Sequence, residues 1–174
     1  MNKIILNKPM LLNKKHVVYF DRDNKFSFSS KRDALDFIVK VGREIEQSIL
    51  FITEEFNSLE EFYRLYYLAN KDYKFKFLMN NSVDLINNRL EWMHSHEGSP
   101  NHDVILFHSI ITCIEELCVA FALMQNKAGA RKDTITKRRC ALKLHVINIY
   151  HEKFMALGIK PKESFLRIKK QNKG

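Results

Sequence analysis

The chain has 174 residues, of which 45% are hydrophobic and 28% are charged, and its formal net charge is +9. That balance excludes an intrinsically disordered chain, and the length is enough for one domain with its own core. Only five glycines and three prolines supply turn chemistry, which excludes a many-stranded β architecture and favours helices. We therefore expect a single, mainly α-helical domain.

The cysteine content and the N-terminus indicate where the protein is found. Cys113, Cys118 and Cys140 all fall in helical patterns, and their odd number does not indicate a disulfide framework. We expect buried thiols in a reducing compartment. The polar N-terminus does not match a signal peptide. We therefore expect a cytoplasmic protein, or a virion protein if a phage encodes it.

Residues 1–29 predict an arm followed by a β-hairpin. Residues 1–14 show no periodicity, whereas His16–Asp21 and Lys25–Ser29 are rich in residues that favour strands. Asp23 and Asn24 between them supply turn chemistry. Because an isolated hairpin is marginal in water, we expect this one to lie on the helices or on a partner.

The next stretch predicts two of about five helices that form a bundle. Ser30 starts the first, with Asp33 in a capping-box-like position, and apolar residues then recur at spacings of three and four as far as Ile52. Residues 58–61, Ser-Leu-Glu-Glu, form a better capping box. They predict a second helix that runs to about Ala69.

Three further helices are predicted over residues 75–93, 99–125 and 133–157. The Ser-Pro pair that opens the middle one combines a helix cap with a proline at the first helical position. Residues 126–131 are expected to form a connection. Gly158 is expected to close the last helix.

The stretch Asp103–Gln125 is apolar on nearly every side, with one narrow polar line through His108, Thr112, Glu115 and Glu116. A helix of this kind has to be surrounded by other helices. Two adjacent carboxylates and a histidine near its middle would be costly in lipid, so we do not expect a membrane span.

The second predicted helix carries an aromatic face made by Phe62, Tyr63, Tyr66 and Tyr67. Core packing is the first interpretation of such a cluster. A base-stacking platform is the alternative, but nothing that resembles a basic groove alternates with these rings in the sequence. We therefore expect the rings to pack in the core.

The positive charge is concentrated in two segments of the C-terminal third. Residues 127–143 hold seven basic residues and one acid, and residues 158–174 hold six basic residues and one acid, which leaves the rest of the chain at −2. We divide the chain into an arm and hairpin (1–29), a helical bundle (30–158) and a basic tail (159–174). The candidate anion-binding residues are Lys127, Arg131, Lys132, Lys137, Arg138, Arg139, Lys143, Lys160, Lys162, Arg167, Lys169 and Lys170.

Cations at the start of a helix oppose its dipole and weaken it by a few tenths of a kcal/mol each. A cluster that weakens its own helix indicates an anionic partner that offsets the cost. Phosphates, contacted without reading of bases, are one candidate, and an acidic protein surface is the other. An ordinary solvated face is the alternative that involves no partner.

Arg89 and His94 have the Arg-x4-His spacing, which resembles the ribonuclease motif of HEPN domains, a family of small helical bundles. The resemblance covers six residues, and Leu90 replaces the polar residue that usually follows the arginine. It implies that His94 acts as a general acid or base and that Arg89 holds the phosphate.

A histidine-rich loop holds His94, His96 and His102. Imidazoles bind zinc or iron, but this set spans a Gly-Ser-Pro turn, and we expect neither a metal nor a cofactor.

The function we expect is that of a non-enzymatic assembly or binding protein. Its basic C-terminal third contacts nucleic acid or other protein subunits, without a membrane and as part of an oligomer or a larger assembly. The Asn-, Lys- and Ile-rich usage favours a virion or nucleoprotein component. The HEPN-like ribonuclease is the alternative.

Overall fold

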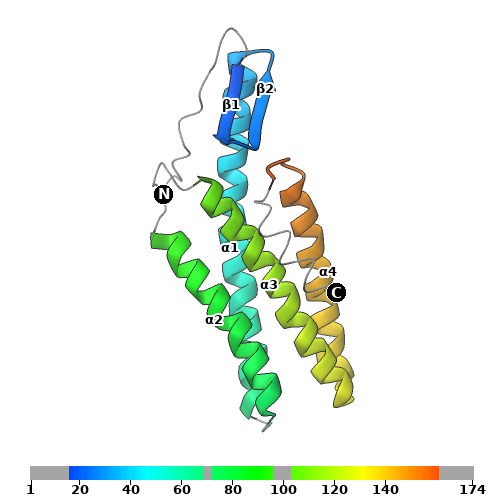
Figure 1. Ribbon diagram of the computed structural model, residues 1–174. Coiled ribbons are helices and arrows are strands. Elements are labelled where there is room, and N and C mark those ends of the chain that lie inside the picture. The colour runs from blue at the N-terminus through cyan, green and yellow to red at the C-terminus, as the bar shows by residue number, and fades with distance from the viewer. Residues whose placement is uncertain (1–15, 69–71, 96–102, 161–174) are drawn as a thin grey trace.

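The computed structural model describes residues 16–68, 72–95 and 103–160. Within them the chain forms a two-stranded hairpin and four helices that alternate in direction along an elongated bundle (Figure 1). The mainly helical fold and the hairpin are thus confirmed, and the expected count of about five helices is slightly too high. The elements are β1 His16–Asp21, β2 Asn24–Phe28, α1 Lys31–Leu68, α2 Tyr73–Ser95, α3 Asp103–Ala130 and α4 Thr134–Met155.

Helix α1 runs without a break through the point where two helices were predicted. Its start is as expected, because the Ser30 hydroxyl accepts a hydrogen bond of 3.1 Å from the backbone N–H of Asp33. The prediction of a second start at residues 58–61 was wrong. No glycine or proline lies between Ile52 and Leu59, and Ile52, Phe56 and Leu59 continue the buried stripe at helical spacing.

Helix α3 is the centre of the bundle and packs against α1, α2 and α4. Among the described helices, its segment Ile105–Ala130 is the one with the length and composition of a membrane span, and 61% of its apolar window is buried. Its two adjacent carboxylates point to different neighbours. Glu116 accepts a hydrogen bond of 2.7 Å from Ser82 of α2, and Glu115 lies 3.8 Å from His151 of α4.

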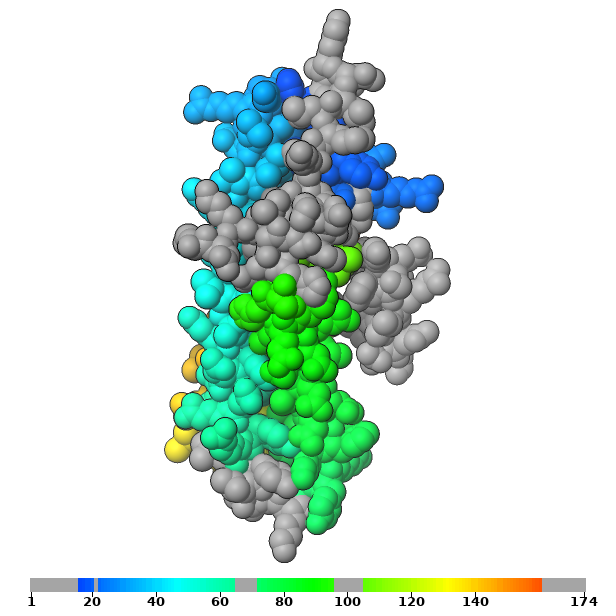
Figure 2. Space-filling view, turned by 90° about the vertical axis from the view of Figure 1, so that its left-hand side faces the viewer, coloured from blue at the N-terminus to red at the C-terminus, as the bar shows by residue number. Residues whose placement is uncertain are grey.

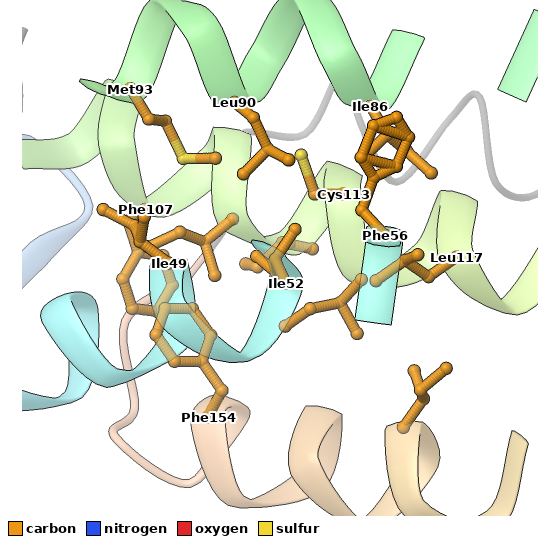
Figure 3. Close-up of a cluster of buried hydrophobic side chains, with 14 of the residues drawn as sticks. Ile49, Ile52, Phe56, Ile86, Leu90, Met93, Phe107, Cys113, Leu117 and Phe154 are labelled. Atoms are coloured by element: carbon orange, nitrogen blue, oxygen red, sulfur yellow. The ribbon is translucent and has the colours of Figure 1, made fainter. Parts of the chain in front are cut away.

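The core takes side chains from all four helices (Figure 3). Phe107 of α3 stacks on Phe154 of α4, with the ring centroids 4.4 Å apart. Phe62 of α1 packs edge-on against Phe121 of α3, which confirms core packing for that ring. The residues labelled in Figure 3 are Ile49, Ile52, Phe56, Ile86, Leu90, Met93, Phe107, Cys113, Leu117 and Phe154.

The hairpin lies on the first turns of α1, at the end of the bundle where α4 finishes (Figure 1). Val18 and Phe20 are buried on its inner face. Phe26 and Phe28 come within 4.8 and 5.2 Å of Phe37 of α1, centroid to centroid. The hairpin is therefore held by an aromatic cluster, because two strands alone do not bury enough apolar area.

The connection between α3 and α4 is shorter than predicted. Residues 126–130 are helical, and only Arg131, Lys132 and Asp133 separate the two helices. Lys132 makes the turn with a positive φ of 58°. Asp133 caps α4, as predicted, by accepting a hydrogen bond of 3.1 Å from the N–H of Thr136. Gly158, with φ of +82°, lies just beyond the end of α4.

Helices α1 and α4 meet through long side chains, and the bundle is splayed along this seam. Tyr150 of α4 stacks on Phe51 of α1 at 4.0 Å. A cleft of about 350 Å³ opens beside Lys143. On the face seen in Figure 2, by contrast, α1 and α2 lie side by side and contact each other.

Replacement of Ser58 by alanine tests whether α1 is continuous. A serine inside a helix has no capping role, so we expect Ser58→Ala to change the free energy of unfolding by less than about 0.5 kcal/mol. Asp133→Ala is the matched control, because it removes a real cap and should cost about 1 kcal/mol. Urea unfolding followed by circular dichroism measures both. An equal loss in the two variants would contradict a continuous helix.

Candidate functional site

The starts of α2 and α4 and the end of α3 carry cations, and they gather at the end of the bundle away from the hairpin. Helices α2 and α4 begin there, and α1 and α3 finish there (Figure 1). Neither α2 nor α4 has an acidic residue in its first turn. Each of these N-termini is capped by an aspartate, Asp72 in α2 and Asp133 in α4, which offsets part of its partial positive charge. We call this end of the bundle the basic end, made by the starts of α2 and α4 and the last turn of α3.

The start of α2 is fixed to the end of α3 by an ion pair. Asp72 caps α2 by accepting a hydrogen bond of 3.1 Å from the N–H of Phe75. Its other carboxylate oxygen binds the ammonium group of Lys127, which also lies 5.6 Å from the centroid of the Phe75 ring. The Lys127 hydrogen bond, helped by the Phe75 N–H, lowers the pKa of Asp72 from its ordinary value of 3.8. Lys127 thus has a structural role at the basic end.

Two more of the predicted cations hold the seam between α1 and α4. Lys143 lies 3.1 Å from a carboxylate oxygen of Glu55, which is buried. The guanidinium of Arg139 lies 4.9 Å from the centroid of Phe62. Both cations line the cleft along the seam. A carboxylate as buried as Glu55 requires a partner of opposite charge, so Lys143 is committed to the fold.

The remaining cations of this segment are exposed at the basic end. Arg131, Lys132, Lys137 and Arg138 follow one another from the turn after α3 to the second turn of α4, and all four are exposed. The fold adds Lys74, an exposed residue of α2 that lies far from this segment in the sequence. Sequence reasoning missed Lys74 because it looked for runs of charge and not for neighbouring helix termini.

Lys160, the cation of the second basic segment that lies within the described residues, is away from the basic end. The backbone of Lys160 exchanges hydrogen bonds of 3.1 and 2.6 Å with the side chain of Asn24 in the hairpin. The 22 residues of α4, about 33 Å at 1.5 Å per residue, separate it from the start of that helix. The other four tail residues that were predicted to bind anions, Lys162, Arg167, Lys169 and Lys170, lie outside the described residues.

No protein-family model, curated protein or solved structure matches this chain. The site is accordingly assigned from its geometry and charge.

Arg89 and His94 both lie on α2, but they point in different directions. Five residues along a helix correspond to about 140° of rotation and about 7.5 Å of rise. Arg89 is half-buried, and its charge acts on Cys113 of α3. His94 is exposed in the last turn. The structure thus does not bring the two side chains to one point, and the ribonuclease alternative stays a prediction.

The remaining candidate groups are histidines and cysteines. His96 and His102 lie outside the described residues, and within those residues no cluster of His, Cys, Asp and Glu could hold a metal ion. Cys113 and Cys140 are buried as expected, and Cys118 is half-buried. Burial raises the pKa of Cys113 to about 12 and that of Cys140 to about 11. Both thiols are therefore protonated and unreactive near neutral pH.

Replacement of Asp72 by asparagine tests the ion pair through its pH dependence. Because the folded state lowers the pKa of Asp72, its carboxylate stabilises the fold fully above pH 3.8 and progressively less as the pH falls through the lower folded value. Asparagine keeps the cap. We therefore expect wild type and Asp72→Asn to differ in unfolding free energy by a constant amount at neutral pH, and by less below about pH 4.

Urea unfolding from pH 3 to pH 7 measures that difference. In a Lys127→Met background the pH dependence should shrink, because the main cause of the lowered pKa is gone. A difference between wild type and Asp72→Asn that is the same at pH 3 and pH 7 would contradict the role given to the Asp72–Lys127 pair.

Proposed function

We propose that this protein is a non-enzymatic binding protein whose basic end contacts the phosphate backbone of a nucleic acid. The observation that carries the proposal is the exposed row of Arg131, Lys132, Lys137 and Arg138, placed beside two helix N-termini. Lys132, Lys137 and Arg138 make no ion pair with an acid of the described residues. An anion that binds there offsets both the repulsion among these cations and their conflict with the dipole of α4.

The chemistry of the basic end favours contact with phosphates and not with base edges. Lysine and arginine side chains exposed at a helix end reach phosphates on the surface of a nucleic acid, and such contacts carry no sequence information. The proposed binding is therefore weak in sequence preference and strong in its dependence on salt. Binding that depends on phosphates and not on base sequence suits a nucleoprotein or virion component.

The dependence of affinity on salt tests the proposal. We expect binding to a labelled 20-nucleotide DNA or RNA to weaken linearly on a plot of log K against log salt concentration. Removal of two phosphate contacts in Lys137→Ala/Arg138→Ala should make that slope shallower by about 1.5, at about 0.7 to 0.9 per contact. Fluorescence anisotropy between 50 and 300 mM salt, on the order of the range where such contacts are screened, measures it.

Lys31→Ala/Arg32→Ala is the matched control, because it removes two exposed cations from the first turn of a helix at the hairpin end. Its slope should equal that of wild type. Equal slopes in all three proteins, or no binding at low salt, would contradict the proposal. If poly-glutamate of matched charge binds as tightly as the oligonucleotide, the anionic partner is an acidic protein surface.

A second surface favours the assembly role. Helix α4 exposes an apolar stripe that includes Ile135, Leu142 and Ile149, which are 72%, 66% and 53% exposed. The three residues are spaced by seven, the repeat of a helix–helix seam. Val146 adds to the stripe beside the cleft. We propose that a second copy of this chain covers it, with the two α4 helices antiparallel.

The register and the charges both favour the antiparallel pair. A two-fold axis at Leu142 sets that residue against its own copy and Ile135 against Ile149 of the second copy. The same register places Glu152 opposite Lys132 and Lys153 opposite Arg131 of the second copy, so these flanking charges nearly cancel. A parallel pair would instead align Lys137, Arg138 and Arg139 with their own copies, and like charges in register are destabilising.

Introduction of a charge into the stripe tests this pairing. Leu142→Glu places a carboxylate against its own copy on the axis, so we expect a loss of at least about 30-fold in dimer affinity, the scale of a central interface residue. Sedimentation velocity, or light scattering after size exclusion, gives the mass. The protein is used at about 100 µM, a concentration well above the dissociation constants of specific contacts. Leu50→Glu on α1 alters an equally exposed leucine and should keep the dimer. A monomeric wild type would overturn the pairing.

A further inference from the structure

Two aromatic side chains stand exposed at the start of α2, within the basic end. Tyr73 is 77% exposed and Phe77 is 66% exposed. They are four residues apart, so they lie on the same face of the helix, one turn from each other. Phe75, which lies between them in the sequence, is buried and packs edge-on against Tyr63 of α1 at 6.2 Å. The segment 73–77, Tyr-Lys-Phe-Lys-Phe, therefore alternates aromatic and basic residues, and the helix sends one ring inward and two outward.

The helix turn that carries these rings is held firmly. Asp72 caps it and binds Lys127 of α3. One turn further along α2, the Tyr63 hydroxyl donates a hydrogen bond of 2.8 Å to the side-chain oxygen of Asn80. The backbone beneath both rings is thus fixed from two neighbouring helices. A ring presented on a fixed backbone loses little conformational entropy when a ligand packs on it.

Cations flank the rings. Lys74 is exposed between them on α2. The Asp72–Lys127 pair joins this turn to the end of α3, and Arg131 and Lys132 follow one turn later. Helices α2 and α3 are in contact, and contacting helices pack about 8 to 10 Å apart, so the start of α2 and the cations of the α3–α4 turn lie on neighbouring helices at one end of the bundle. The start of α2 forms the lower part of the face seen in Figure 2.

The rings distinguish between forms of nucleic acid. In a duplex the faces of the bases are stacked on each other, and an exposed ring cannot reach them. In a single strand the faces are free, and a stacked aromatic side chain strengthens binding by about 5- to 150-fold per base without regard to sequence. Phosphate contacts alone would not require exposed aromatic side chains.

We propose that the basic end binds single-stranded nucleic acid, with Tyr73 and Phe77 each stacked on a base while Lys74 and the cations of the α3–α4 turn hold the phosphates. This inference rests on the proposed function, because it names the form of nucleic acid that the basic end accepts. It assigns the stacking role to α2 and the electrostatic role chiefly to α3 and α4.

The test compares two kinds of variant on two kinds of ligand. The ligands are a labelled 15-nucleotide single strand and a labelled 15-base-pair duplex, on the order of the site sizes known for single-strand binding. We expect Tyr73→Leu/Phe77→Leu, which keeps apolar side chains but removes the rings, to weaken single-strand binding by about 10- to 100-fold. Its salt slope and its duplex affinity should not change. Leu35→Ala/Leu50→Ala, which trims two exposed apolar residues of α1, is the control and should bind as wild type does.

A direct readout comes from Phe77→Trp. This variant keeps a π-face, so it should retain the affinity for the single strand, and emission from the new exposed indole should be quenched when the strand binds. The same emission should not change with the duplex. Trp92 is partly buried against the core, so Trp92→Phe serves as the background that isolates the signal.

The outcomes separate this inference from the function on which it rests. If Lys137→Ala/Arg138→Ala loses salt dependence while the ring variant binds as wild type does, the stacking role is overturned and the phosphate role stands. If the ring variant weakens single strand and duplex equally, preference for the single strand is overturned. If wild type binds neither ligand at low salt, the proposed function fails, and the inference fails with it.

Discussion

Burial of α3 is the constraint on which the rest of the structure depends. This helix is apolar on nearly all sides, so it is stable in water only when other elements cover it. Helices α1, α2 and α4 do so, and the stack of Phe107 on Phe154 is one of the contacts that result. Because short connections make successive helices antiparallel, the starts of α2 and α4 arrive at the same end. The basic end is therefore a consequence of how α3 is covered.

The cations of residues 127–143 divide into two groups with different roles. Lys127, Arg139 and Lys143 contact Asp72, Phe62 and Glu55, and they join helices that are distant in the sequence. The other cations of the segment are exposed to solvent, on helix ends that these contacts hold in place. A single run of charge in the sequence thus supplies both side chains that join the helices and the side chains of the proposed contact surface. Stability and the proposed binding can for that reason be altered separately, by different members of the run.

Periodicity predicted the class of fold, the hairpin and the burial of the central helix, because these depend on which residues are apolar and at what spacing. It failed at residues 58–61. A serine followed by two glutamates has the local chemistry of a helix start, but Phe56 and Leu59 bury on the same stripe as Ile52. Packing across the bundle therefore overrode the local signal. Residues 126–130 were misread in the same way, since Ala128 is buried and prolongs α3.

The sequence indicated the cations of the α3–α4 turn, because they are contiguous. It did not indicate Lys74, Tyr73 and Phe77, because their proximity to that turn exists only once α2 and α3 pack. Phe62 shows why rings cannot be assigned from type alone. It belongs to the aromatic cluster that was weighed as a stacking platform, yet it is buried under Arg139 and against Phe121. Whether a ring is buried or exposed depends on whether it lies on the side of its helix that faces α3.

The two proposed surfaces of α4 have a joint consequence. The apolar stripe begins at Ile135 in the first turn of α4, within the basic end, and runs to Ile149. In an antiparallel pair centred on Leu142, the starts of the two α4 helices point in opposite directions. Eight residues separate Thr134 from Leu142 in each copy, so the two α4 starts lie about 24 Å apart along the pair. In the proposed pair, the apolar seam thus holds two basic ends at a fixed spacing. Each copy would contribute one electrostatic contact and the seam the link between them, so binding of one basic end to a polyanion would raise the effective concentration of the other at the same polyanion.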